Sequence, residues 1–226
     1  MTSTRPLFLV LLMSLIVWTS CESEDAADVN QQRIETNYTL AYNAGDRKTT
    51  ASASFLFGST FLKINSPSSI TFDDDRLKET EILGIVDYQK SYGTKVPSGT
   101  FVYTNNDGVV YRNTLSLPAD IDLPSSLTEL SIAEGARITW EGAPLKSGET
   151  VTFHLSGDGG DFYASIGLVN ATFIEIDSAD IQATLLGQCG MSISRSFSGS
   201  LAEATEEGGV AHSQITSETY AVNVVD

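Results

Sequence analysis

The chain has 226 residues, with 13 basic against 29 acidic side chains and a formal net charge of −16 at pH 7. A surface with this excess of negative charge repels phosphate backbones and anionic lipid headgroups. The composition therefore argues against nucleic acid as a partner, and the charge is sufficiently explained by solubility in an exported compartment.

The first twenty residues have the three parts of a secretory signal. Arg5 is their single charge, an uncharged apolar run extends from Leu7 to Trp18, and Thr19 and Ser20 follow. The run is shorter than the roughly 18 apolar residues that a membrane-spanning helix needs, and no basic stop-transfer cluster follows it. Residues 1–20 are therefore predicted to be a signal peptide.

The junction at Cys21 resembles the lipobox of bacterial lipoproteins, in which small residues precede a cysteine that is acylated and then exposed by cleavage. Trp18 departs from that pattern, because the family usually has leucine three residues before the cysteine. The resemblance implies lipid attachment at Cys21. Because Glu22 rather than aspartate follows, it also implies the outer membrane, on either its periplasmic or its surface side. The alternative is ordinary signal-peptidase cleavage, with Cys21 an incidental thiol.

Residues 21–34 are polar and acidic and show no hydrophobic period, which predicts a disordered tether. The chain has two cysteines, so lipid on Cys21 would leave Cys189 without an intramolecular partner. Since Leu185, Leu186 and Met191 are its neighbours in sequence, we expect Cys189 to be a small buried hydrophobe rather than a reactive thiol.

From Tyr38 onward apolar and polar residues alternate in short runs, which turn residues interrupt at intervals of roughly 8 to 12 residues. This spacing predicts an all-β fold. Asp107-Gly108 can adopt the positive φ of a tight turn, so we expect a hairpin whose strands carry Tyr103 and Tyr111 side by side. Two stretches, 74–81 and 125–134, are each expected to allow one helical turn.

Two prolines and two acids between Pro118 and Ser126 interrupt the strand pattern near the middle of the chain. We therefore expect two tandem immunoglobulin-like β-sandwich domains, at 35–122 and 123–226, each of about a hundred residues. Segments 61–66 and 173–178 share one pattern of residue types, which also favours a tandem arrangement.

The stretch around Trp140, with a strand pattern from Glu149 to Phe153 after it, resembles bacterial immunoglobulin-like or fibronectin-type modules. The resemblance implies that Trp140 packs in a core. The cysteine pair of antibody-type domains is missing, so the resemblance concerns the architecture.

Few residues point to chemistry. His154 and His212 are the only histidines, both lie in strand patterns, and no Gly-x-Ser-x-Gly nucleophile elbow occurs. The cysteines and histidines are too scattered for a zinc site. The acidic loops at 73–75 and 157–161 offer oxygen ligands for calcium, but neither fits an EF-hand, and the glycines of the second already explain a hairpin turn.

Four tyrosines crowd into the first half of the chain: Tyr88, Tyr92, Tyr103 and Tyr111. If these tyrosines were exposed, they would form a platform for binding a protein or glycan. We favour the alternative, in which they pack in the core or pair across neighbouring strands.

Two hypotheses of function follow. The first is a lipid-anchored envelope or cell-surface module without catalytic activity, which binds the membrane through Cys21 and presents its β-sandwiches to a protein or glycan. This hypothesis assigns no catalytic, cofactor-binding or metal-binding residue. The alternative is a β-sandwich hydrolase or carbohydrate-active protein that uses a pair of carboxylates, whose separation is a three-dimensional fact.

Overall fold

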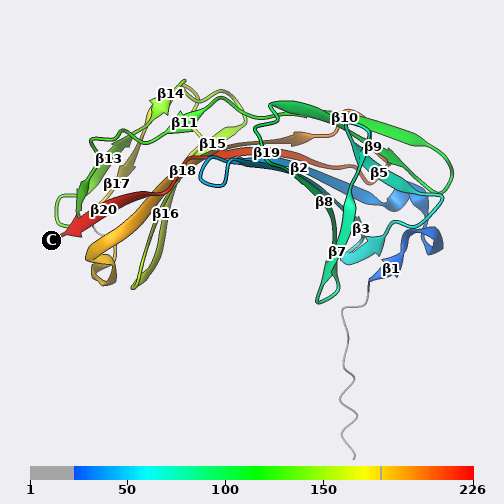
Figure 1. The fold of residues 1–226 in the computed structure, drawn as a ribbon, viewed down its shortest axis with the longest axis horizontal. Helices are drawn as coiled ribbons and strands as arrows, with labels where there is room; N and C mark the ends of the chain where they lie inside the picture. The colour runs from blue at the N-terminus through cyan, green and yellow to red at the C-terminus, as the bar shows by residue number, and fades with distance from the viewer. Residues whose placement is uncertain (1–22, 179) are drawn as a thin grey trace, which may run out of the picture.

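The computed structural model describes residues 23–178 and 180–226, and in these residues nearly all the regular secondary structure is β-strand (Figure 1). The predicted all-β fold class is confirmed. The predicted signal peptide and Cys21 lie outside the described residues.

One large sheet runs through the whole described part of the chain. Its central path has the strand order β1-β4-β3-β2-β19-β18-β15-β16, and four further strands branch from it. The strands of the path are β1 (Glu24–Asp25), β4 (Thr60–Lys63), β3 (Lys48–Phe57), β2 (Glu35–Asn43), β19 (Gly209–Thr216), β18 (Gly187–Ser200), β15 (Glu149–Gly157) and β16 (Gly160–Ile166). The branching strands are β7 (Lys78–Ile82), β8 (Ile85–Tyr92), β12 (Glu129–Ser131) and β20 (Tyr220–Val225).

Three smaller sheets cover this large sheet. The first has the order β10-β9-β5-β6, and the other two are the pairs β11-β14 and β13-β17. Their strands are β5 (Ser69–Phe72), β6 (Asp75–Arg76), β9 (Ser98–Thr104), β10 (Val110–Ser116), β11 (Ile121–Asp122), β13 (Ala136–Thr139), β14 (Glu141–Gly142) and β17 (Phe173–Ile176). Three short 3-10 helices complete the described part: η1 (Ala26–Asp28), η2 (Gln31–Arg33) and η3 (Ala183–Leu185).

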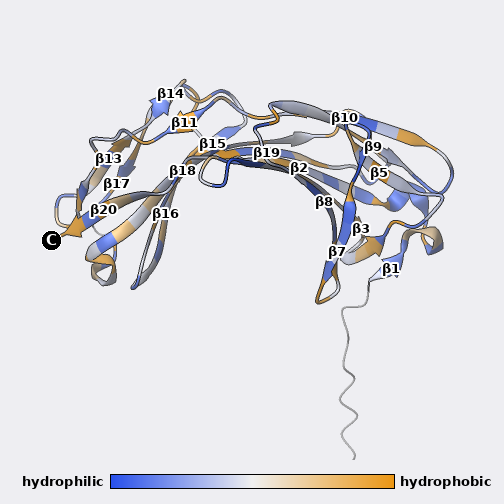
Figure 2. Ribbon diagram, in the orientation of Figure 1, coloured by the Kyte–Doolittle hydropathy of each residue, from blue (hydrophilic) through white to orange (hydrophobic). Residues whose placement is uncertain are grey.

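Strict alternation of side chains decides which face of each strand is buried. In β3, Thr49, Ala51, Ala53 and Phe55 are buried while the residues between them are not. This is the period of two that a strand requires when one face packs on a core. Figure 2 shows the same mixture of polar and apolar residues along most strands.

The buried apolar side chains form two separate cores, one in each half of the arch seen in Figure 1. The first lies beneath the β10-β9-β5-β6 sheet and is rich in aromatic rings, such as the stacked pair Tyr38 and Phe101, whose centroids are 4.8 Å apart. The second lies beneath β11-β14 and β13-β17 and contains Trp140, which is 4% exposed. The core position that the family resemblance implied for Trp140 is confirmed.

Strand β19 joins the two halves. It pairs in parallel with β2 over Gly209–Thr216 and antiparallel with β18, whose earlier residues pair with β15 and β20. Ile215 packs in the second core, whereas Ala211, four residues earlier, packs against the first. The division at residues 122 and 123 therefore stays a hypothesis, and one sheet crosses it.

The prediction of a disordered tether is wrong for residues 23–34. Glu24 and Asp25 pair in parallel with β4, and Ala26 and Ile34 are fully buried in the first core. The Gln31 side chain donates to the carbonyl oxygens of Ala26 at 2.6 Å and of Val29 at 2.9 Å. Two widely spaced apolar anchors give no periodic signal, so the composition alone misled the prediction.

The two predicted helical turns are also wrong. Residues 74–81 hold β6 and most of β7, and residues 125–134 hold β12, which pairs in parallel with β20. Local charge and capping residues favoured a turn of helix, but in each case backbone pairing with a neighbouring strand decides the conformation.

The predicted hairpin at 105–108 is confirmed. Tyr103 and Tyr111 are Cα partners across β9 and β10, and their rings stack with centroids 5.9 Å apart. The fully buried Asn105 holds the turn, because its Oδ1 accepts from the backbone N–H groups of Asp107 at 3.0 Å and Val109 at 2.9 Å.

We predict that Asn105→Ala destabilises the protein by about 1–3 kcal/mol, since it leaves two backbone donors without their acceptor. Asn106→Ala is the matched control, because the side-chain amide of Asn106 makes no hydrogen bond in the described structure and its loss should cost less. Urea unfolding of the two variants measures the difference. An equal or larger loss in Asn106→Ala would contradict this account of the turn.

Candidate functional site

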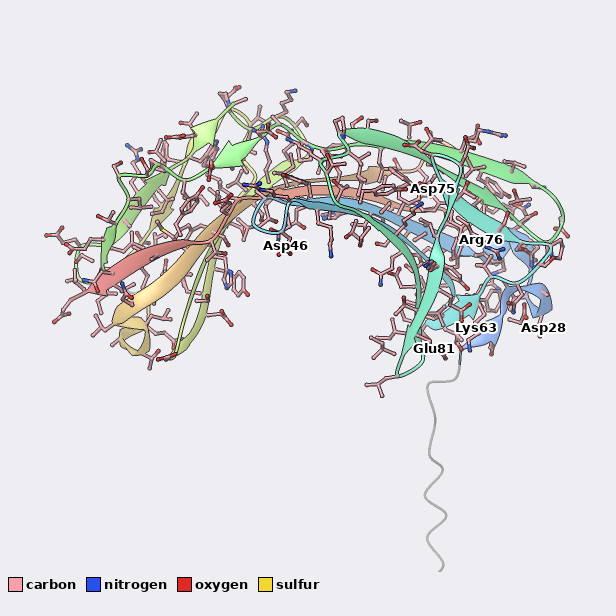
Figure 3. The ribbon with its side chains drawn as sticks, viewed as in Figure 1. Asp28, Asp46, Lys63, Asp75, Arg76 and Glu81 are labelled. Atoms are coloured by element: carbon pink, nitrogen blue, oxygen red, sulfur yellow. The ribbon has the colours of Figure 1, made fainter. Side chains whose placement is uncertain are left out.

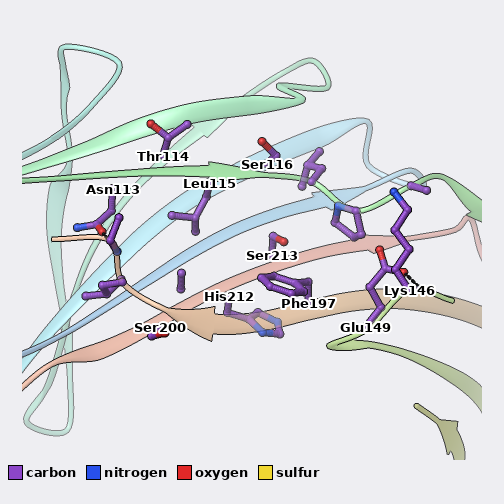
Figure 4. A pocket seen from close by; sticks show the side chains of 16 residues that line it. Asn113, Thr114, Leu115, Ser116, Lys146, Glu149, Phe197, Ser200, His212 and Ser213 are labelled. Carbon is purple, nitrogen blue, oxygen red and sulfur yellow. Dashed lines mark hydrogen bonds between the residues drawn. The ribbon is translucent and has the colours of Figure 1, made fainter. Parts of the chain in front are cut away.

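A groove lies where the two halves meet, between the edge strand β10 and the ends of β18 and β19 (Figure 4). Its volume is about 410 Å³. The lining comes from β10 and the connection that follows it, the start of β15 and the loop before it, β18 and the loop after it, and β19: Asn113, Thr114, Leu115, Ser116, Leu117, Pro118, Ala119, Lys146, Glu149, Phe197, Ser200, Leu201, Ala202, Ala211, His212 and Ser213.

The backbone of β10 presents unpaired groups along this groove. Leu117 N–H donates to the carbonyl oxygen of Pro97. The backbone N–H and C=O groups of the odd-numbered residues in this stretch therefore point toward β9. The backbone N–H and C=O groups of the even-numbered residues point away from β9. In agreement, Arg112 N–H donates to Oε2 of Glu203 at 2.6 Å. Within the described residues β10 has no second partner strand, so the N–H groups of the exposed Thr114 and Ser116 form a free sheet edge.

The loop after β18 fixes one end of this edge. Asn113 Oδ1 accepts from the N–H groups of Ala202 at 2.8 Å and Glu203 at 3.1 Å, and Asn113 Nδ2 donates to the carbonyl oxygen of Glu203 at 2.8 Å. The Glu203 carboxylate thus accepts from the outward N–H of Arg112, the even-numbered residue before Thr114 and Ser116. It leaves the next two open.

Phe197 supplies an apolar surface within the groove. Phe197 is 40% exposed. Two glycines allow the ring to lie against the backbone: a Cβ at Gly148, where φ is +80°, would stand 2.8 Å from Cε2, and one at Gly199 would stand 3.1 Å from Cε1 and Cζ. Larger residues at these positions would displace the ring.

A buried ion pair supports the wall of the groove. Arg195 is fully buried, and its guanidinium donates to the carbonyl oxygens of Ala143 and Pro144, each at 2.8 Å, and to Oε2 of Glu149 at 2.5 Å. The same carboxylate oxygen accepts from Lys146 N–H at 2.6 Å. Arg195 therefore holds the loop that carries Lys146 into the groove (Figure 4).

Opposing effects act on the Glu149 carboxyl group. Burial by itself raises its pKa, but the hydrogen bonds from Arg195 and from the Lys146 N–H, together with the charge of Arg195, outweigh burial and hold the pKa below its ordinary value. Glu149 is thus ionised and committed to Arg195. Of the described residues that line the groove, it is the one carboxylate, so the groove does not offer the pair of carboxylates that the hydrolase hypothesis needs.

The two histidines lie on separate strands and have different surroundings. His212 borders the groove, with Nδ1 2.8 Å from Oγ of Ser198. His154 stacks on Tyr163 with ring centroids 4.4 Å apart, and its Nε2 lies 2.9 Å from Oδ1 of Asp161. Both are partly exposed strand residues, as their sequence context predicted.

The two acidic loops are hairpin turns. Asp73 and Asp74 adopt positive φ between β5 and β6, and Asp73 Oδ1 accepts from Thr100 N–H at 2.7 Å. Gly157 and Gly160 close the turn between β15 and β16. Across residues 23–178 and 180–226, no group of three or more His, Cys, Asp or Glu side chains is arranged to hold a metal ion.

The tyrosines and Cys189 belong to the interior. Tyr88, Tyr103 and Tyr111 are buried in the first core and Tyr92 is partly buried against it, as the preferred interpretation predicted. Cys189 is 7% exposed, and its Sγ–H donates to the carbonyl oxygen of Leu185 at 3.2 Å. Burial, with a smaller contribution from the charge of Asp158, raises the pKa of the thiol, so the predicted buried hydrophobe is confirmed.

Sequence reasoning missed the groove. Neither the edge strand of the groove nor Phe197 belongs to a recognisable sequence motif. Arg195 could have been noticed, because it follows Met191 and Ile193 at two-residue spacing, which places a charged side chain at an inward-facing position of the strand. A charge at such a position needs a partner.

Outside the groove, burial raises the pKa of Asp87 to about 6.

Comparisons with known proteins give no family. No protein-family profile and no curated protein matches the chain. Among the described residues, no helix has the length and apolar character needed to span a bilayer.

Solved structures show distant similarity only. The chain is similar to the fibronectin(III)-like modules of Clostridium thermocellum CbhA, with 13% identity, 84% of this chain and 94% of that chain covered, and a TM-score of 0.25. It is also similar to the Yersinia pseudotuberculosis adhesin InvE, with 9% identity, 83% of this chain and 61% of that chain covered, and a TM-score of 0.22. A bacterial ice-binding adhesin is similar with 12% identity, 85% of this chain and 65% of that chain covered, and a TM-score of 0.24. At these TM-scores the similarities carry no argument about function.

We predict that Arg195→Met lowers the free energy of unfolding at pH 7 by about 3–5 kcal/mol, because it leaves a buried carboxylate without its cation. Glu175→Gln, which removes an exposed partner of Arg137, is the control and should cost less than about 1 kcal/mol.

The same ion pair predicts a pH dependence. The folded pKa of Glu149 is depressed, so its contribution to stability is complete above the unfolded value of about 4.5 and is lost as pH falls through the lower folded value. The difference in unfolding free energy between the wild type and Glu149→Gln should therefore shrink below about pH 4.5. A difference that stays constant down to pH 3 would contradict this assignment.

Proposed function

We propose that this protein is a lipid-anchored binding module of the bacterial outer membrane, attached through Cys21, which binds an extended segment of a partner polypeptide and does not catalyse a reaction. The observation that carries the binding proposal is the free edge of β10 beside the groove. The anchor rests on the lipobox resemblance at residues 18–21.

An extended peptide fits the groups along the groove. Its backbone would pair with the outward N–H and C=O groups of Thr114 and Ser116, which supply main-chain hydrogen bonds without regard to sequence. An apolar side chain of the peptide would pack on the exposed ring of Phe197. Lys146 adds a positive charge at one end, in a chain whose net charge is −16, and so favours an acidic residue there.

The few ionisable side chains of the groove favour binding over catalysis. Its carboxylate is paired with Arg195, and its histidine is the only imidazole among the lining residues. Asp87, whose pKa burial raises, is not one of the groove residues.

We predict that a random-peptide library panned against the mature wild-type chain yields extended peptides that lose about tenfold in affinity for Thr114→Pro. Proline removes one outward N–H, and one lost hydrogen bond of about 1.4 kcal/mol is tenfold in affinity. The fold should tolerate the change, because this N–H does not bond to β9.

Thr114→Ser keeps the N–H and is the matched control. Selected peptides that bind Thr114→Pro and the wild type equally would contradict the site. If the chain bound a glycan array and no peptides, and Phe197→Ala abolished that binding, the ligand of the groove would be a sugar and not a peptide.

We predict that cells grown with labelled palmitate label the wild-type chain and spare Cys21→Ser, because the thiol at position 21 is the acylation site that the lipobox resemblance implies. Cys189→Ser is the control and should label as the wild type does, since that thiol is buried. Equal labelling of Cys21→Ser would contradict the anchor.

A further inference from the structure

The tip of the β7–β8 hairpin exposes three large aliphatic side chains. Ile82 is 66% exposed, Leu83 90% and Ile85 54%. Leu83 and Gly84 form the turn with φ of +53° and +81°. Asparagine, aspartate and glycine adopt positive φ far more readily than leucine does, so a polar turn would be the ordinary choice here. Figure 2 shows the tip as an apolar end on a mostly polar hairpin.

The described chain begins beside this tip. Ser23 Oγ donates to Oε1 of Glu81 at 3.1 Å, and Lys63 Nζ lies 2.7 Å from the other oxygen of the same carboxylate. Glu81 immediately precedes Ile82, and Figure 3 shows Glu81 and Lys63 in the lower part of the first half. Cys21 precedes Ser23 by two residues in the sequence, and two fully extended residues span at most about 7 Å.

We propose that Ile82, Leu83 and Ile85 insert into the lipid bilayer beside the acyl chains on Cys21, as a second membrane contact. The proposal rests on the lipid anchor of the proposed function, because the anchor brings the tip to the bilayer. The occupant is lipid because these apolar side chains follow Glu81, which bonds to Ser23, and Ser23 is two residues after the cysteine expected to carry lipid.

Charge selects the kind of bilayer. Lys63 and Glu81 neutralise each other at the base of the tip, and the chain as a whole is strongly acidic. Anionic headgroups would be repelled, so insertion is expected into zwitterionic lipid.

The second contact would orient the molecule. A single flexible lipid link leaves a domain free to tumble, whereas a link and a hairpin tip together fix one face toward the membrane. Figure 1 shows β10 on the opposite side of the molecule from the β7–β8 tip. The groove would then face away from the bilayer.

The test places a tryptophan at the tip of the lipidated, mature chain. Leu83→Trp is compared with Val169→Trp, an exposed aliphatic position of the second half that is 56% exposed. Each variant is incorporated into phosphatidylcholine vesicles with brominated acyl chains, which quench indole fluorescence on contact. We expect several-fold stronger quenching and a blue shift for Leu83→Trp, relative to Val169→Trp and to the buried Trp140 of the parent chain. Equal quenching at 83 and 169 would overturn the proposal.

Mass analysis of Cys21 separates this proposal from the anchor. An unmodified Cys21 would refute the lipid anchor. The unmodified chain mixed with the vesicles then tests insertion of the tip by itself: quenching of a tryptophan at position 83 would support insertion, and absence of quenching would refute it. A lipidated chain whose residue 83 remains unquenched would refute the tip alone. Sedimentation without vesicles is the last measurement. A dimer that Leu83→Asp converts to a monomer would show that a second copy covers the tip, and would also overturn the proposal.

Discussion

Strand β19 hydrogen-bonds to β2 on one side and to β18 on the other, and this double pairing makes one sheet of two halves that have separate cores. Without β19, β2 would expose an unpaired edge and the first core would lose Ala211. The loop that leads from β18 to β19 also reaches the first half, where it hydrogen-bonds to Asn113 in the middle of β10. The groove depends on the same connection, because its two walls come from different halves.

The sequence predicted those features that depend on neighbouring residues. Alternation predicted the strands, and Asp107-Gly108 predicted the hairpin that pairs Tyr103 with Tyr111. It did not predict contacts between distant segments: β19 joins β2 across more than 170 residues, and Arg195 meets Glu149 from another strand. The similar segments 61–66 and 173–178 lie in different sheets, because β4 belongs to the large sheet and β17 to a covering pair, and the tandem arrangement that they favoured stays a prediction.

The groove and the hairpin tip both leave groups without partners, but of different kinds. The free edge of β10 offers polar backbone groups beside one aromatic ring, which suits an extended peptide. The tip offers aliphatic side chains and almost no polar groups, which suits lipid. Strand β10, which borders the groove, and the β7–β8 tip lie on opposite sides of the molecule (Figure 1), which allows a lipid contact and a protein contact at the same time.

Native-state hydrogen exchange of the mature chain tests most directly the central claim that β19 makes one cooperative unit of the two halves. The slowest amides of β3, in the first half, and of β15, in the second, should share one opening free energy and one dependence on urea concentration. If instead one set exchanged through a separate opening of lower free energy while the other stayed protected, the halves would be independent domains and this account of the sheet would be wrong.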